Sequence, residues 1–129
     1  MTEPVRRVRP AELSAGQATP GMRREQAVAT EGMWAGVVHT DAGAFSGWHH
    51  HAEYESTIYV LSGALRMEFG PGGGEVLDAL PGDFLYVPPF SVHREGNTTG
   101  ETSTILVTRA GHGEAVVNVE GPEAADPPR

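Results

Sequence analysis

The chain has 129 residues, and its nine basic side chains, all arginine, are outnumbered by 17 acidic ones, which gives a net charge of −8. At this length we expect one domain with a single core, and the acidic balance disfavours nucleic acid and anionic membranes as partners. No apolar run is long enough for a membrane span or a signal peptide, which predicts a soluble, cytoplasmic protein. The chain has no cysteine, so any metal must be bound by imidazole or oxygen ligands.

The sequence predicts a series of short β-strands with little helix. The best candidate for a helix is Pro10 to Gln17, where Pro10 occupies the first turn. Apolar runs bounded by Gly, Pro, Asn or Asp then predict strands. In chain order they are Met22 to Ala29, Met33 to His39, Gly47 to His51, Ser56 to Leu61, Ala64 to Phe69, Asp83 to Val87, Val92 to Glu95, Thr102 to Arg109 and Ala115 to Val119. Short strands at this close spacing are typical of a β-sandwich or barrel.

Glycine and proline mark the connections between these strands. Ser62-Gly63 predicts a tight hairpin, because glycine adopts the positive φ that such turns need. Residues 70–74, Gly-Pro-Gly-Gly-Gly, predict a loop, and Pro81-Gly82 predicts a turn. Asn97 is expected to fix a turn through its side chain.

The histidines gather in the middle of the sequence, and three of them are consecutive. In a strand, side chains two residues apart project from the same face. His49 and His51 can therefore offer two imidazoles to one ion, while His50 points to the other face. His93 begins another predicted strand and can complete a set of three. Three imidazoles leave open positions on an octahedral ion, so we expect one divalent transition metal per chain, either Fe, Mn, Ni, Co or Zn.

These segments resemble the two sequence motifs of the cupin superfamily, over roughly residues 33–110. His49-x-His51 followed by Glu55 is similar to the first motif. The second motif is matched by Gly82, Pro88, His93 and Asn97, with Phe90 where the family has a second glycine. The resemblance implies an all-β fold with minor helix, the cupin double-stranded β-helix or jelly-roll barrel. It also implies that His49, His51, His93 and Glu55 are metal ligands.

One departure from the motif concerns the carboxylate. Glu55 lies eight residues before Gly63, whereas the family's glutamate lies seven before its glycine, and Ser56 occupies that position. A slip of one residue turns a side chain to the opposite face, so Glu55 reaches the metal only if a bulge or an altered turn absorbs it. We therefore predict Glu55 as a fourth ligand or a catalytic base. The alternative is that Ser56, not Glu55, faces the interior.

The resemblance divides the chain into four segments. Residues 1–32 are expected to be an N-terminal arm with strands that make a dimer contact, and residues 33–110 the barrel core. Residues 111–119 form a final strand, and residues 120–129 an acidic, disordered tail. Small cupins pair or exchange N-terminal strands, so a homodimer is expected. Arginines of the arm could then contact acids of the partner: Arg6, Arg7, Arg9, Arg23 and Arg24.

Side chains near the histidines are candidate walls of a substrate pocket: Trp48, Ser56, Phe84, Tyr86 and Phe90. Arg66 and Arg109 lie in predicted strands, where a buried guanidinium would need a carboxylate partner. Either could bind an acidic substrate, although a salt-bridged or exposed arginine is more common.

The resemblance implies several chemistries on this scaffold, namely dioxygenases, isomerases and epimerases, decarboxylases and cyclases, and the fold does not choose among them. Our first hypothesis is a metal-dependent enzyme acting on a small organic molecule. If Ser56 takes the carboxylate position, a three-histidine centre similar to that of oxygen-activating iron cupins favours a dioxygenase over an isomerase or cyclase. The alternative is a non-catalytic barrel that binds or senses a small molecule.

Overall fold

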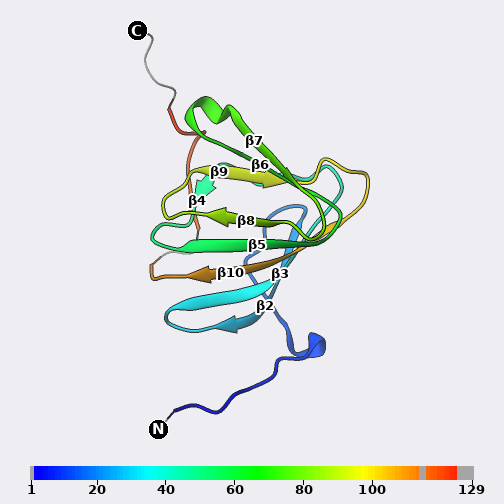
Figure 1. Cartoon of the computed structure of the whole chain (residues 1–129), viewed down its shortest axis with the longest axis vertical. Helices are drawn as coiled ribbons and strands as arrows, with labels where there is room; N and C mark the ends of the chain where they lie inside the picture. The colour runs from blue at the N-terminus through cyan, green and yellow to red at the C-terminus, as the bar shows by residue number, and fades with distance from the viewer. Residues whose placement is uncertain (1, 114–115, 125–129) are drawn as a thin grey trace.

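A computed structural model describes residues 2–113 and 116–124 and shows two antiparallel β-sheets with two single turns of 3-10 helix (Figure 1). The first sheet has the order β1-β2-β3-β10-β5-β8 and the second the order β11-β4-β9-β6-β7. The strands of the first sheet are β1 (Ser14–Ala15), β2 (Met22–Ala29), β3 (Met33–Thr40), β10 (Ser103–Ala110), β5 (Glu55–Ser62) and β8 (Phe84–Val87). Those of the second are β11 (Val117–Asn118), β4 (His49–His50), β9 (His93–Gly96), β6 (Leu65–Phe69) and β7 (Glu75–Ala79). The predicted all-β fold is confirmed.

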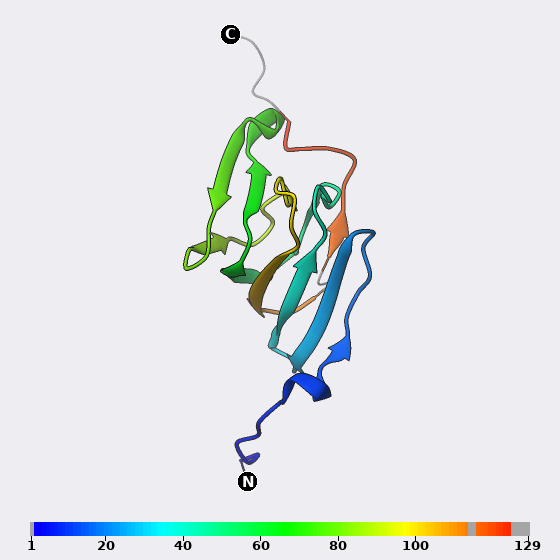
Figure 2. The same ribbon diagram turned by 90° about the vertical axis from the view of Figure 1, so that its right-hand side faces the viewer.

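The core lies between the two sheets. In β10 the buried residues alternate with less buried ones along the whole strand, as expected when one face of a sheet is covered. Apolar side chains from both sheets meet there, including Val38, Ile58, Val60, Leu65, Met67, Ile105 and Val107. Figure 2 shows β2 and β3 (blue to cyan) on one side of the molecule and β6 and β7 (green) on the other. A functional site formed by inward-facing side chains of both sheets would therefore lie in this interior.

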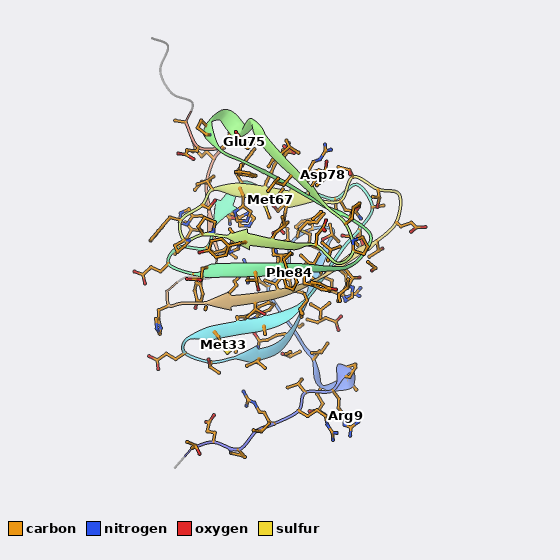
Figure 3. All side chains as sticks on the ribbon, viewed as in Figure 1. Arg9, Met33, Met67, Glu75, Asp78 and Phe84 are labelled. Carbon is orange, nitrogen blue, oxygen red and sulfur yellow. The ribbon has the colours of Figure 1, made fainter. Side chains whose placement is uncertain are left out.

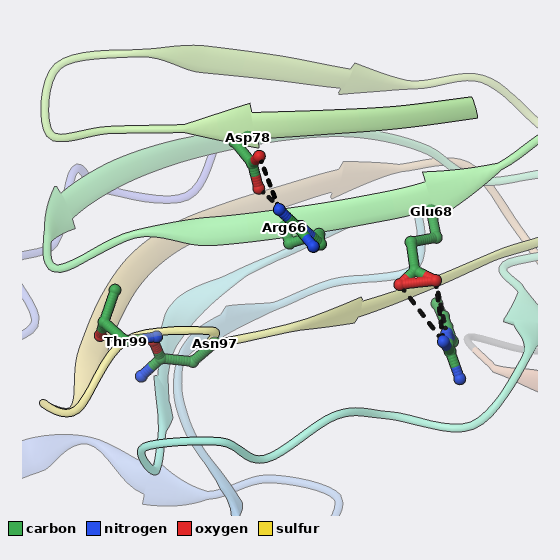
Figure 4. Close-up of polar contacts among 6 residues, drawn as sticks. Arg66, Glu68, Asp78, Asn97 and Thr99 are labelled. Atoms are coloured by element: carbon green, nitrogen blue, oxygen red, sulfur yellow. Dashed lines mark hydrogen bonds and ion pairs between the residues drawn. The ribbon is translucent and has the colours of Figure 1, made fainter. Parts of the chain in front are cut away.

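Strand β7 was not predicted from the sequence. Its residues are exposed except for Ala79, because β7 is an edge strand that pairs only with β6. An edge strand that buries so little of its surface has no apolar alternation to reveal it. Arg66 and Asp78 are directly opposite each other in this pair and form an exposed ion pair with Nε–Oδ1 2.8 Å (Figure 4).

Two predicted turns have the expected physical basis. Gly63 follows β5 with φ of 75°, and a Cβ there would overlap Ser103, so both conformation and space require glycine. Asn97 is fully buried, and its Oδ1 accepts hydrogen bonds from the backbone N and Oγ1 of Thr99, which lies beside it (Figure 4). The Nδ2 of Asn97 donates to the Thr40 carbonyl. The Asn97 side chain therefore ties the β9–β10 turn to β3.

The described N-terminal segment extends from the barrel (Figure 1). The helix expected over Pro10 to Gln17 is a single 3-10 turn, η1 (Pro10–Glu12), followed by β1, and Arg9 lies on the extended segment before it (Figures 1 and 3). The second 3-10 turn, η2 (Pro71–Gly73), lies in the predicted glycine-rich loop. The predicted tail, 120–129, and final strand, 111–119, fall partly on residues 125–129 and 114–115, which are outside the described residues. Within the described ranges, no helix is long and apolar enough to cross a membrane.

Candidate metal centre

Three histidines from two neighbouring strands meet in the interior. His49 and His93 pair directly across β4 and β9, and His51 follows β4 on the same face as His49. One ligand nitrogen from each of the three lies within 4.8 Å of those of the other two, and the residues are only 1–5% exposed. The structure thus brings together the three imidazoles that the sequence predicted as metal ligands.

Backbone carbonyls fix which ring nitrogen of two of these histidines faces the centre. His49 Nδ1 lies 2.9 Å from the Gly47 carbonyl oxygen, and His93 Nδ1 lies 2.8 Å from that of Ser91. A carbonyl can only accept a hydrogen bond, so each Nδ1 carries the proton and each Nε2 keeps a lone pair. In metal sites, a hydrogen bond from the ring nitrogen that does not bind the metal commonly orients the imidazole.

The surroundings of His49 favour its neutral form. Burial, and then the neighbouring His93, lower the pKa of His49 below its ordinary value, while Glu95 acts in the opposite direction. A neutral imidazole is the form that binds a metal ion. The donor set therefore fits a divalent transition metal, since it offers nitrogen ligands in a fixed orientation and leaves positions open for a substrate.

Glu55 does not join the three histidines, which corrects its prediction as ligand and catalytic residue. It is exposed at the start of β5, whereas Ser56 is 3% exposed and faces the interior. The pairing of β5 with β10 is regular from Ala110↔Glu55 to Ile105↔Val60, so no bulge is present at this end to turn Glu55 inward. Of the two alternatives, the structure selects Ser56 as the inward residue.

A different carboxylate, Glu95, lies beside the centre and was missed in the sequence. It is two residues after His93 in β9 and thus on the same face, and it is 5% exposed. Its Oε1 is 3.8 Å from Nε2 of His49, too long for a hydrogen bond. The spacing His93-x-Glu95 repeats that of His49-x-His51, and this signal could have identified Glu95.

Two arginines also reach the interior. Arg24 in β2 is 7% exposed and Arg109 in β10 is 6% exposed. Within its own chain Arg24, which was predicted to contact a partner subunit, donates from Nη1 to Thr19 Oγ1 at 2.9 Å and to the Gln17 carbonyl at 3.2 Å. Arg66, in contrast, lies on the outside in its ion pair with Asp78.

Each histidine of the centre lines a different cavity. His93 lines an apolar cavity of about 150 Å³, together with Met67, Phe69, Leu77, Leu85, Tyr86, Val87, Pro88 and Ser91. His49 lines a more polar cavity of about 210 Å³ under residues 17–20 of the N-terminal segment. His51 lines a small inner space between the sheets, which also contains Ser56. The centre is therefore approached from two sides of the barrel.

Two of the five residues predicted as walls of a substrate pocket line one of these cavities. Tyr86 lines the apolar cavity and Ser56 the inner space. Trp48, Phe84 and Phe90 line none of these three cavities. The Arg94 guanidinium lies over the Trp48 ring, 5.1 Å from the centroid of that ring. The Phe84 side chain packs against the Tyr59 ring and is 71% exposed.

Phe90 occupies the position of the motif's second glycine and keeps the backbone conformation that a glycine would adopt. Its φ is 59°, which is uncommon for a bulky side chain. The ring is 60% exposed and lies 5.9 Å from that of His50. His50 points away from the centre, as predicted, and its Nδ1 accepts a hydrogen bond from the Ala52 backbone.

The cupin-domain family model, Cupin_2, matches residues 36–109, and the chain belongs to the cupin family. With its buried cluster of three histidines it is a metal-binding cupin.

Several solved structures share the fold. A conserved protein with a double-stranded β-helix domain from Klebsiella pneumoniae is 22% identical, with a TM-score of 0.68 over 81% of this chain and 90% of that one. KdgF from a Halomonas species is 24% identical, with a TM-score of 0.66 over 80% and 93%.

A deletion mutant of oxalate decarboxylase from Bacillus subtilis is 23% identical, with a TM-score of 0.68 over 79% of this chain but only 29% of the enzyme. Another structure of that enzyme is described as having Mn(II) centres. At these identities the likeness shows the fold alone. A search of curated proteins finds no match.

Proposed function

We propose that this cupin is a mononuclear metal-dependent enzyme that acts on a small organic molecule, and that its reaction is a dioxygenation. The observation that carries the proposal is the buried set of three imidazoles with Ser56, not a glutamate, in the inward position of β5. A bound Fe(II) ion would supply the redox chemistry that couples oxidation of the substrate to reduction of dioxygen.

The residues of the chain contribute orientation and exclusion of water. The carbonyls of Gly47 and Ser91 hold the rings of His49 and His93 in one orientation, which keeps the ligand geometry the same with and without substrate. The apolar cavity beside His93 keeps bulk water away from that side of the centre. Glu95, not Glu55, is the carboxylate placed to take a proton from the substrate, since it is buried beside His49.

The test is oxygen consumption by the reconstituted protein. We expect protein loaded anaerobically with Fe(II) to consume oxygen with a β-diketone, a catechol or a thiol, each offered with and without a carboxylate group, faster than the same concentration of free iron. His51→Ala should lose this activity together with the metal, whereas His50→Ala should keep both, because His50 points away from the centre. No uptake above free iron with any of the three classes would refute the dioxygenase.

The same experiment separates the alternatives. Conversion of a substrate without oxygen uptake would favour an isomerase or cyclase. Metal in the protein as purified, with a bound ligand that is never converted, would favour a binding or sensing module. A His51→Ala variant that loses the metal but keeps its affinity for the ligand would support the latter.

We also propose a homodimer in which the N-terminal segment contacts the partner. The support is that residues 2–7 are exposed and extend from the barrel, and that β1 leaves one edge of the first sheet open (Figure 1). Size-exclusion chromatography with light scattering should give twice the chain mass of 13.7 kDa. A monomer would contradict the proposal.

A further inference from the structure

Two guanidinium groups lie in the interior without an ion pair to any residue that the structure describes. Arg24 and Arg109 are almost completely buried, and the Nε of each has no hydrogen-bond partner among the described residues. Within the described ranges, no carboxylate oxygen lies within 4.0 Å of a nitrogen of either side chain. Buried arginines are rare unless they are paired, because an uncompensated charge in the interior is costly.

None of the direct contacts of these arginines is with an anion, and the nearby carboxylate of Glu95, which acts in favour of the charged form of Arg109, lies more than 4.0 Å away. Arg24 donates from Nη1 to two neutral oxygens, of Gln17 and Thr19. The guanidinium of Arg109 lies over the Trp34 ring, 5.0 Å from its centroid, and its burial lowers the pKa of Arg109. Arginine nevertheless stays protonated in proteins. These interactions position the two groups without neutralising them.

The balance of charge in the interior is positive. Among the described residues the buried acid is Glu95, so two buried cations stand against one anion. A divalent ion on the three histidines would add two further positive charges. The interior therefore lacks negative charge beside the candidate metal centre.

The two guanidiniums belong to one compartment. Arg24, Arg109, Ser56, Glu95 and His51 line the small inner space between the sheets, whose volume of about 10 Å³ is that of about one water molecule. The Oγ of Ser56 there has no hydrogen-bond partner within the described part of the chain. One atom of the size of a water oxygen, such as one oxygen of a carboxylate, fits in this space.

Room for the rest of the ligand lies next to it. Arg24 also lines the polar cavity of about 210 Å³ that is bordered by His49, Ser46 and the N-terminal residues 17–20. A ligand in this cavity can contact the face of the centre at His49 and place its terminal group between the sheets at Arg24. The polar lining suits a charged or hydroxylated molecule better than a hydrocarbon.

We infer that the substrate of the metal centre is a small carboxylic acid, and that its carboxylate is bound by Arg24 and Arg109. The inference rests on the proposed function, since it names the substrate class of that centre. A carboxylate supplies the missing negative charge, and its two oxygens match the planar donors of a guanidinium. It can also accept a hydrogen bond from Ser56.

The test measures anion binding by the metal-free protein, so that the ligand cannot act by chelating a metal. Malonate is the probe, and malonamide, with the same skeleton but no charge, is its control, both in calorimetric titrations at constant ionic strength. We expect malonate to bind and to raise the melting temperature, and malonamide to do neither. Equal effects of the two compounds would overturn the inference.

Variants of the two arginines test where malonate binds. Arg24→Gln and Arg109→Gln should each weaken malonate binding by about tenfold or more, as expected when a charged hydrogen bond is lost. Arg66→Gln is the matched control, because Arg66 is exposed in its ion pair with Asp78, and it should bind malonate as the wild type does. Wild-type affinity in both interior variants would refute the role of the two arginines.

The lysine variants cover the case in which a glutamine variant does not fold, as judged by circular dichroism. Arg24→Lys and Arg109→Lys keep the charge but lose the planar pair of donors, so they should fold and bind malonate more weakly. Unchanged affinity in both would refute the inference. Failure of the proposed enzyme gives a different result, because the metal-free protein would still bind malonate while the Fe(II) protein would not consume oxygen.

Discussion

Glu95→Gln gives a direct test of which carboxylate belongs to the interior. Glu95 is 5% exposed and is the buried acid that shares a compartment with Arg24 and Arg109. Glutamine has nearly the same shape, so the substitution removes charge without creating a cavity. Neither guanidinium lies within 4.0 Å of the carboxylate, and at that distance a charge pair contributes at most about 4 kcal/mol for an effective dielectric constant of about 20.

With two such pairs at longer distances, we expect Glu95→Gln to lower the free energy of unfolding of the metal-free protein by about 2–4 kcal/mol. Urea unfolding followed by tryptophan fluorescence measures this difference. The matched control is Glu55→Gln, which should change stability by less than about 0.5 kcal/mol because Glu55 is exposed. A Glu95→Gln protein as stable as wild type, or a larger loss in Glu55→Gln, would refute this account of the interior.

Two further predictions concern the metal and the packing near it. Zinc at about 100 times its dissociation constant should stabilise the wild-type protein against thermal unfolding by about 2.7 kcal/mol. The His50→Ala variant should keep this stabilisation, and the His93→Ala variant should lose it. Equal stabilisation of the two variants would contradict the three-histidine site. Gly96→Ala places a Cβ against the Phe45 ring and should lower the free energy of unfolding by about 1–3 kcal/mol. Gly47→Ala is the control, because the Cβ there meets open space. Equal melting temperatures of the two variants would show that the Phe45 ring can move.

Much of the architecture could be predicted from the sequence because it depends on local patterns. Strands β2, β3, β5 and β10 lie in β-type runs bounded by turn-forming residues and were predicted within a residue or two. Strand β7 could not be predicted, since an edge strand that buries only Ala79 has no such alternation. The spacing of His49 and His51 placed both rings on one face, and this too is a local property of a strand.

The residue that faces inward at β5 was decided only by the tertiary structure. Glu55 and Ser56 are adjacent, and the sequence left both open because a bulge could exchange their faces. The pairing with β10 is regular at this end, so Ser56 faces the histidines. Register between strands depends on partners that are distant in the sequence, and a slip of one residue reverses every face.

The sequence by itself determined an acidic, cysteine-free, all-β chain whose possible metal ligands are three histidines. The tertiary structure decided what surrounds them. Arg24, expected to contact a partner subunit, and Glu95, which was overlooked, come from opposite sheets and are both buried. Burial of a charged side chain is a property of the assembled sheets, since it depends on which strands enclose it, and a single strand pattern does not contain that information.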